Sequence, residues 1–191
     1  MKVEALEQEL KLNGLSIFTP KDVARLTGKR LNYIYLILSK SNRFVRIQNG
    51  LYCLTNTDPF NIASRIVSPS YISLISAFSY YKLIDQVPYI IKVMINKRHA
   101  SIDSVMGMRI EFKSIKREML YGYNNVHNIS IADPEKAIVD SLYLLEDTQY
   151  VKEAIANANE RSMINKGKLL GYAKKCGIRR VYAEIEKLVE K

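Results

Sequence analysis

A pair of adjacent residues, Asn49-Gly50, constrains the N-terminal part of this chain more than any other feature. The pair stands between two runs of β-prone residues, 44–47 and 51–54. Asn-Gly in that setting is the strongest short-range signal for a β-hairpin, because both residues accept the positive φ angles of a two-residue turn. We therefore predict a hairpin whose two strands pack against the segments that precede them.

Two short helices are predicted directly before the hairpin. Thr19-Pro20 is typical of a helix start, because threonine caps free N–H groups and proline fits the first helical position. Gly28 favours a turn after this helix, and a second helix is predicted over about residues 30–39. We expect the second helix to bury four apolar residues with helical spacing, Leu31, Ile34, Tyr35 and Leu38.

Another amphipathic helix, over residues 3–12 and closed by Gly14, is predicted before this pair. Three helices followed by a hairpin are typical of a winged helix-turn-helix, a fold that places the second helix of the pair in the major groove of DNA. We assign this domain to residues 1–56, because the polar, turn-prone segment 55–59 follows the hairpin.

Positive charge is concentrated in this part of the chain. Residues 16–56 carry seven Lys and Arg side chains and one acid, Asp22, which gives a net charge of +6 against +10 for the whole sequence. Clustered cations of this kind neutralise DNA phosphates and release counterions. A basic surface that serves only protein contacts is the alternative that the sequence leaves open.

Ten side chains of this domain are predicted to contact double-stranded DNA. Those at the start of the second helix are expected to reach base edges in the major groove, and those of the hairpin to lie against phosphate or the minor groove. The candidates are Lys21, Lys29, Arg30, Asn32, Tyr33, Lys40, Arg43, Arg46, Gln48 and Asn49. We expect an operator with repeated half-sites, bound by a homodimer or by cooperating monomers.

Residues 57–191 are predicted to form a mixed α+β domain with a small sheet and a helical C-terminal tail, so the expected fold class is α+β. Runs of β-branched or alternating residues predict three strands, at 89–95, 109–113 and 126–131. Helical periodicity predicts the remaining elements, at about 59–66, 71–83, 133–145, 150–158, 168–175 and 181–189.

Residues that carry catalytic or metal chemistry are sparse. His99 and His127 have no neighbouring ligands at metal spacing, Cys53 and Cys176 lie far apart, and the sequence has no glycine-rich phosphate loop. We therefore expect no enzyme activity, no metal and no cofactor. A long apolar segment and a signal peptide are also lacking, which leads us to expect a cytoplasmic protein without a membrane contact.

One charged cluster, at residues 133–140, has two interpretations. In the structural interpretation, Asp133 caps a helix, Glu135 suits the helix N-terminus, and Lys136 pairs with Asp140 one turn later. In the alternative, Lys136, Asp140 and Asp133 form the centre of a nucleic-acid-processing enzyme. The structural interpretation accounts for every charged residue of the cluster, and we favour it.

Several segments resemble, in order along the chain, the AbiEi antitoxins, which are winged-helix regulators of bacterial and archaeal abortive-infection systems in viral defence. Residues 49–52 are similar to the end of the family's wing, and 71–83 with 86–88 are similar to one of its helices and the segment after it. Residues 131–140, IADPEKAIVD, are similar to its iA.pEKt..D segment, with alanine where threonine is usual. The resemblance covers about residues 15–147.

This resemblance implies the antitoxin of a type IV toxin–antitoxin system. Such a protein represses its own operon through the N-terminal domain and counteracts a nucleotidyltransferase toxin through the C-terminal domain. A stand-alone transcriptional regulator is an alternative with the same architecture. A module that only binds a partner protein is a second alternative.

Overall fold

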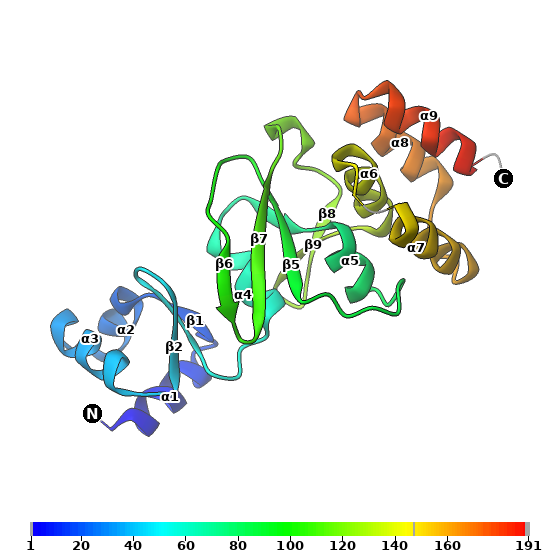
Figure 1. Ribbon diagram of the computed structural model, residues 1–191. Helices are drawn as coiled ribbons and strands as arrows, with labels where there is room; N and C mark the ends of the chain where they lie inside the picture. Colours follow the sequence, from blue (N-terminus) through cyan, green and yellow to red (C-terminus); the bar gives the residue numbers. More distant parts are fainter. Residues whose placement is uncertain (1, 147, 190–191) are drawn as a thin grey trace. The chain divides into compact units, whose positions relative to one another are not determined.

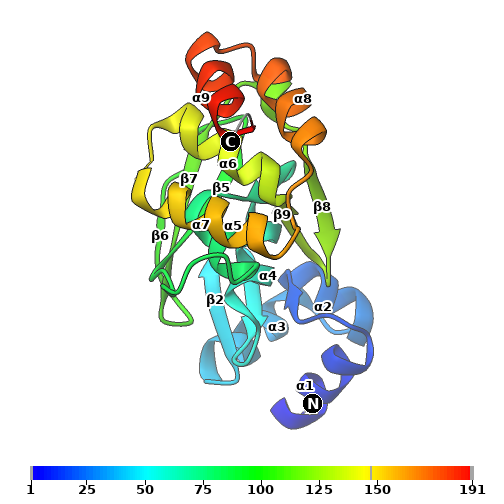
Figure 2. The same ribbon diagram turned by 90° about the vertical axis from the view of Figure 1, so that its right-hand side faces the viewer.

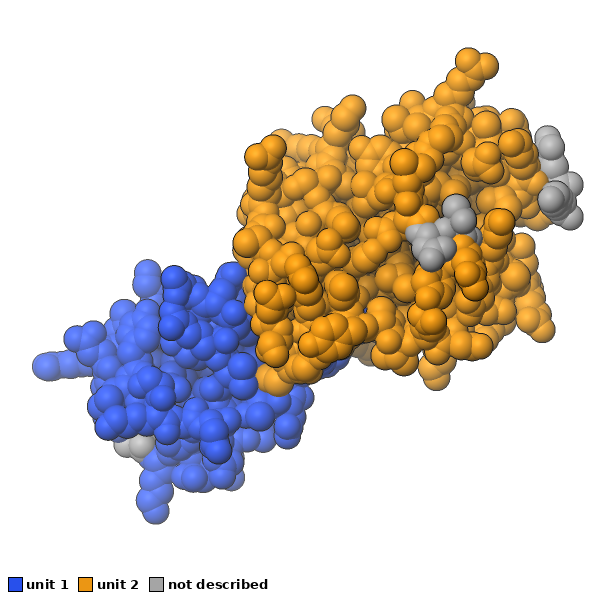
Figure 3. Space-filling view, viewed as in Figure 1, with its two compact units in different colours: residues 1–62 blue, residues 63–191 orange. Residues whose placement is uncertain are grey.

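The computed structural model describes residues 2–146 and 148–189 (Figure 1). The chain divides into two units, residues 1–62 and 63–191 (Figure 3). The boundary falls inside helix α4 (Pro59–Ile66), a few residues after the boundary that we predicted at residue 56. No helix in the described part of the chain has both the length and the apolar character that crossing a membrane requires.

The first unit combines helices with a three-stranded antiparallel sheet in the order β1-β3-β2. Its elements before α4 are α1 (Val3–Leu12), β1 (Ile17–Phe18), α2 (Pro20–Thr27), α3 (Leu31–Lys40), β2 (Phe44–Gln48) and β3 (Leu51–Leu54). The helices predicted in this region and the hairpin of β2 and β3 are confirmed. The short strand β1, which pairs with β3, adds to the predicted elements.

Local signals explain where these elements begin and end. The hydroxyl of Thr19 accepts a hydrogen bond from the N–H of Asp22, and the Asp22 carboxylate accepts one from the N–H of Thr19 at 2.8 Å. This reciprocal capping box starts α2. Gly28 ends α2 with a φ of 66°, and Gly50 has a φ of 74° in the hairpin turn. Glycine adopts such left-handed conformations without a steric penalty.

The core of the first unit draws on its helices and its sheet. Its buried side chains are Leu6, Leu10, Phe18, Val23, Ile34, Ile37, Leu38, Phe44, Tyr52 and Leu54. The prediction that Tyr35 faces this core is wrong, because its side chain is 44% exposed and Ile37 is buried instead. An isoleucine can be buried without removing a hydroxyl from water, so the buried face of α3 includes Ile37 and leaves Tyr35 outside.

The second unit is built on a six-stranded mixed sheet in the order β6-β7-β5-β4-β9-β8. The strands are β4 (Ser70–Ile72), β5 (Ile90–Ile95), β6 (Ile102–Val105), β7 (Met108–Ser114), β8 (Tyr123–Val126) and β9 (Ile129–Ala132). The strands predicted at 89–95 and 109–113 are confirmed as β5 and β7, which pair in parallel. The sheet is larger than predicted, because β4, β6 and a second strand in the 123–132 region also join it.

Two sequence predictions for this unit are wrong. The helix expected over 71–83 begins later, because residues 70–72 form β4, which pairs antiparallel with β5 and parallel with β9. The single strand expected over 126–131 is a hairpin of β8 and β9. His127 and Asn128, with φ of 50° and 66°, turn the chain between these strands. Asparagine and histidine tolerate the left-handed region better than most side chains, which favours the turn at this point.

Helices cover one face of this sheet. The helices of this unit that follow α4 are α5 (Leu74–Tyr80), α6 (Pro134–Leu144), α7 (Thr148–Glu160), α8 (Lys166–Cys176) and α9 (Arg179–Val189), with a 3₁₀ turn at Arg117–Met119. In Figures 1 and 2, α5 and α6 lie against the same face of the sheet, α7 packs onto α5 and α6, and α8 and α9 pack onto α6 and onto each other. The predicted helical C-terminal tail is therefore confirmed as α7 to α9, and the chain as a whole is mixed α+β.

Candidate nucleic-acid interface

The start of α3 brings together four of the predicted contacts. Lys29, Arg30, Asn32 and Tyr33 all have exposed side chains, and the sequence of α3 contains no acidic residue. The free N–H groups at a helix N-terminus carry partial positive charge, which adds to the charges of Lys29 and Arg30. The structure thus gathers two cations, an amide and a phenol at the end of α3 that is electrostatically suited to phosphate.

Two further predicted cations lie at other points of the helical pair. Lys21 is exposed in the first turn of α2, and Lys40 is exposed in the last turn of α3. Within residues 2–146 and 148–189, no carboxylate forms an ion pair with Lys21, Lys29, Arg30 or Lys40. Their charge is therefore available to an external anion. The acid nearest to them in sequence, Asp22, is engaged in the capping box of α2.

The hairpin carries three of the predicted contacts. Arg46 on β2 and Asn49 in the turn are exposed, and Gln48 is half-buried. The Arg46 guanidinium donates a hydrogen bond to the side-chain oxygen of Asn49, which orients both groups at the tip of the hairpin. A break in the regular pairing between Arg46 and Gln48 accompanies this turn. The hairpin therefore presents one oriented cation that no carboxylate of the described residues neutralises.

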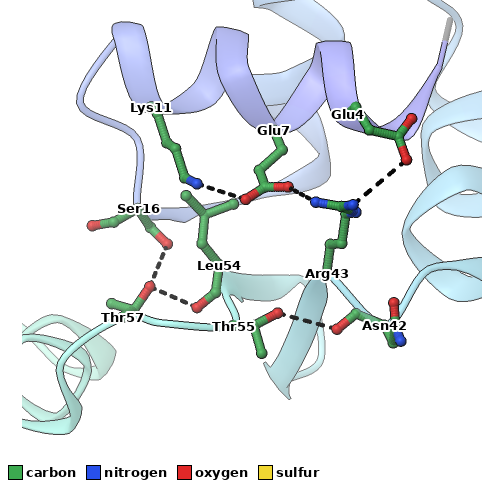
Figure 4. A network of polar contacts seen from close by, with 9 residues as sticks. All are labelled: Glu4, Glu7, Lys11, Ser16, Asn42, Arg43, Leu54, Thr55 and Thr57. Carbon is green, nitrogen blue, oxygen red and sulfur yellow. Dashed lines mark hydrogen bonds and ion pairs between the residues drawn. The ribbon is translucent and has the colours of Figure 1, made fainter.

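Arg43 has a different environment from the one that we predicted. Figure 4 shows its guanidinium between two carboxylates of α1, at 2.6 Å from Glu7 Oε2 and 3.6 Å from Glu4 Oε1. Lys11 also donates to Glu7, at 2.6 Å. The hydrogen bonds from Lys11 and Arg43 lower the pKa of the Glu7 carboxyl, and the bond to Glu7 raises the pKa of Arg43. Arg43 thus joins α1 to the start of β2 and has much of its charge balanced within the unit.

The same picture shows how the end of the hairpin is fixed. The hydroxyl of Thr57 donates to the carbonyl oxygens of Leu54 and Ser16, at 2.8 and 3.2 Å, and the hydroxyl of Thr55 donates to the carbonyl oxygen of Asn42 at 3.1 Å (Figure 4). These bonds tie the segment after β3 to the segments before β1 and β2. They hold the hairpin in a defined position within the first unit.

Sequence reasoning missed the apolar part of the exposed face of α3. Leu36 is 47% exposed, and Tyr35 lies beside it on the helix surface. The signal that could have identified them is the second apolar stripe of α3, which runs through Ile34, Ile37 and Leu38 at helical spacing. Choosing that stripe as the core face leaves Tyr35 and Leu36 on the solvent side.

The charged cluster of the second unit is buried. Lys136 and Asp140 on α6 are completely inaccessible and form an ion pair, so the predicted pairing is confirmed, but not on an exposed face. Asp140 Oδ2 also accepts hydrogen bonds from the hydroxyls of Ser73, at 2.8 Å, and Tyr71, at 3.0 Å. The ammonium of Lys136 lies 4.4 Å from the centre of the Tyr121 ring. Every charged atom of the pair is enclosed by protein.

Burial dominates the ionisation of this cluster. It raises the pKa of the Asp140 carboxyl, while the Lys136 ammonium and the hydroxyl donors act in the opposite direction. Burial also raises the pKa of the Tyr71 hydroxyl, so this group stays protonated and continues to donate to Asp140. A perturbed pKa in a cleft suggests catalysis, but here substrate has no path to the charged atoms.

The prediction that Asp133 caps α6 with its side chain is wrong. Its carboxylate instead accepts hydrogen bonds from Asn124, at 2.5 Å, and Tyr172, at 3.0 Å, and pairs with Lys168 at 3.0 Å. Glu135, also buried, pairs with Lys168 at 3.3 Å. These contacts join the start of α6 to β8 and α8, which accounts for the acids as structural groups.

Comparison with protein-family models found no match for this chain, and comparison with curated proteins found none either.

Proposed function

We propose that the first unit is a winged helix-turn-helix and that this chain is a sequence-specific DNA-binding transcriptional regulator. The observation that carries the proposal is the outer surface of α3, which has no acid and has Lys29 and Arg30 exposed at its N-terminal end. Its opposite surface is committed to the core through Ile34 and Leu38. A helix held in this way can enter a major groove without disturbing the fold.

The hairpin supports the same proposal. In a winged helix the hairpin lies along the DNA backbone, where a cation contacts phosphate and orients the protein without reading sequence. Arg46, held by Asn49 at the tip, suits that role. Arg43 suits it less, because Glu7 and Glu4 already share its charge.

The finer form of the proposal is an antitoxin that represses its own operon and counteracts a nucleotidyltransferase toxin. It rests on the resemblance to the AbiEi antitoxins. One of the similar segments, 131–140, runs from β9 into α6 and contains Lys136 and Asp140. The burial of that pair supports a structural role for the segment. It also argues against the enzyme alternative, because substrate would have to reach these side chains.

The test is a binding titration with the DNA upstream of the chain's own gene and a scrambled duplex of equal length, each at two salt concentrations. A regulator binds the upstream DNA more tightly, and the preference persists at higher salt, because base contacts depend less on counterion release than phosphate contacts do. Equal and salt-labile binding to both duplexes contradicts the proposal.

Matched variants separate the expected roles. Arg30→Ala weakens binding to the operator more than binding to scrambled DNA, whereas Arg46→Ala weakens both and reduces the salt slope by about one phosphate contact. Arg98→Ala, which removes an exposed cation of the second unit, serves as the control for loss of net charge. Identical losses for all three variants on both duplexes contradict the assignment of roles.

A further inference from the structure

The outer surface of α3 contains a large aliphatic side chain, although a solvent-exposed position favours a polar one. Leu36 is 47% exposed. The buried face of α3 is formed by Ile34, Ile37 and Leu38. With 3.6 residues per turn, the positions directly opposite that face are 32, 36 and 39, so Leu36 lies at the centre of the outer surface, one turn after Asn32.

The neighbours of Leu36 limit what can cover it. Asn32 and Lys40 lie one turn before and one turn after it, and both are exposed. The hydroxyl of Ser39 donates to the carbonyl oxygen of Leu36 at 3.1 Å, so its proton is used within the helix. The surface therefore offers one amide, one aliphatic group and one distal cation, together with the cations at the start of the helix. This charge is complementary to a nucleic acid and not to a basic protein surface.

We infer that α3 reads A·T base pairs, with the side chain of Leu36 against the 5-methyl group of thymine and the amide of Asn32 on the edge of an adenine. The inference rests on the proposed function and names the operator chemistry that this helix recognises. In the major groove, thymine alone presents a methyl group, and asparagine is the side chain that pairs bidentately with adenine N6 and N7. Leu36 and Asn32, which lie one helical turn apart, would thus select thymine and adenine, respectively.

The experiment starts from a pool of short duplexes with a randomised centre, from which the full-length protein selects its preferred sequence. That duplex is then synthesised twice, once with thymidine and once with deoxyuridine, which differs only by lacking the 5-methyl group. Wild-type protein is expected to bind the deoxyuridine duplex about fourfold more weakly for each methyl that Leu36 contacts, which is the loss expected for one buried methyl-sized group.

Leu36→Ala carries the decisive comparison. This variant is expected to bind the thymidine duplex about as weakly as wild type binds the deoxyuridine duplex, and to bind both duplexes equally. The matched control is Leu12→Ala, which shortens another exposed leucine of the same unit, 88% accessible on α1. The control is expected to keep the full sensitivity to deoxyuridine. Because both leucines are exposed, neither variant loses core packing.

The outcomes separate the inference from the proposed function. If no sequence is enriched, sequence-specific binding itself is overturned, and the inference with it. If a sequence is enriched but lacks A·T pairs, or if deoxyuridine weakens wild type and Leu36→Ala equally, the protein remains a DNA-binding regulator and the reading by Leu36 is overturned. Unchanged DNA binding by Leu36→Ala also overturns the reading of thymine by Leu36, and it points to a protein partner on this face of α3.

Discussion

Replacing Lys136 by methionine tests the central claim about the second unit, that its ion pair is sealed from water. The substitution leaves an unbranched side chain that is one atom shorter and removes the charge, so the Asp140 carboxylate stays buried without its counter-charge. Breaking one side of a buried ion pair costs about 3–5 kcal/mol. With a urea m-value of about 2 kcal/mol per M, the unfolding midpoint of this unit falls by about 2 M.

The pH dependence of this variant has a definite sign. Burial raises the pKa of Asp140 above its unfolded value, and loss of Lys136 removes the largest opposing influence. A protonated carboxyl needs no counter-charge, so the stability lost at pH 7 returns as the pH falls toward the unfolded pKa of about 3.9. When the pH rises through the raised pKa of Asp140 in the folded variant, the carboxyl ionises and this part of the unfolding free energy is lost again.

The assay is urea unfolding of the full chain followed by circular dichroism, at several pH values between neutral and mildly acidic. The separate unfolding transition of the first unit checks that the variant is otherwise intact. The double variant Lys136→Met/Asp140→Asn should recover at least half of the loss, because the neutral amide oxygen still accepts from Ser73 and Tyr71. A loss below about 1 kcal/mol at pH 7, or one that does not change with pH, refutes the reasoning, because an exposed pair contributes no more than that.

Three smaller predictions concern local geometry and charge. Gly122→Ala is expected to destabilise the second unit by at least about 1 kcal/mol in the same urea assay. Gly122 has a φ of 69°, and an added Cβ would lie 2.9 Å from the Tyr172 ring of α8. The control is Gly171→Ala, where an added Cβ meets open space within a helix, and it is expected to be neutral or stabilising. Thr19→Ala removes the capping box of α2 and should cost about 1 kcal/mol of unfolding free energy in the first unit, and an unchanged midpoint contradicts the capping argument. Arg43→Ala should leave the salt slope of DNA binding nearly unchanged, whereas Arg46→Ala reduces it, and equal slopes for the two variants mean that Arg43 does contact phosphate.

The first unit was predictable because its signals are local. The turn at Asn49-Gly50, the cap at Thr19 and the stop at Gly28 each depend on a few adjacent residues, and the structure has a hairpin, a helix start and a helix end at these positions. The error at Tyr35 arose where two apolar stripes of one helix overlap. Packing against the sheet determines which of the two stripes is buried, and that packing cannot be read from the sequence of the helix alone.

The second unit was less predictable because its sheet and its core are formed by segments that lie far apart in the sequence. Tyr71 and Ile72 read as the start of a helix, but pairing with β5 and β9 on both sides makes them a strand. The spacing of Lys136 and Asp140 indicated their pairing, since it depends only on one helical turn. Their complete burial did not follow from the sequence, because two residues that enclose them, Tyr71 and Tyr121, come from segments elsewhere in the chain.

The central position of β4 sets the order in which the two units can become structured during synthesis. All strand pairings of the first unit lie within residues 17–54, so this unit can fold as soon as its segment has left the ribosome. β4 must wait for β9, which ends at Ala132, and the enclosure of Lys136 also needs α6. At about 5–20 residues per second, the second unit follows the first by on the order of ten seconds. We therefore expect a nascent chain to carry a folded N-terminal unit while the segments that complete the sheet are still being made.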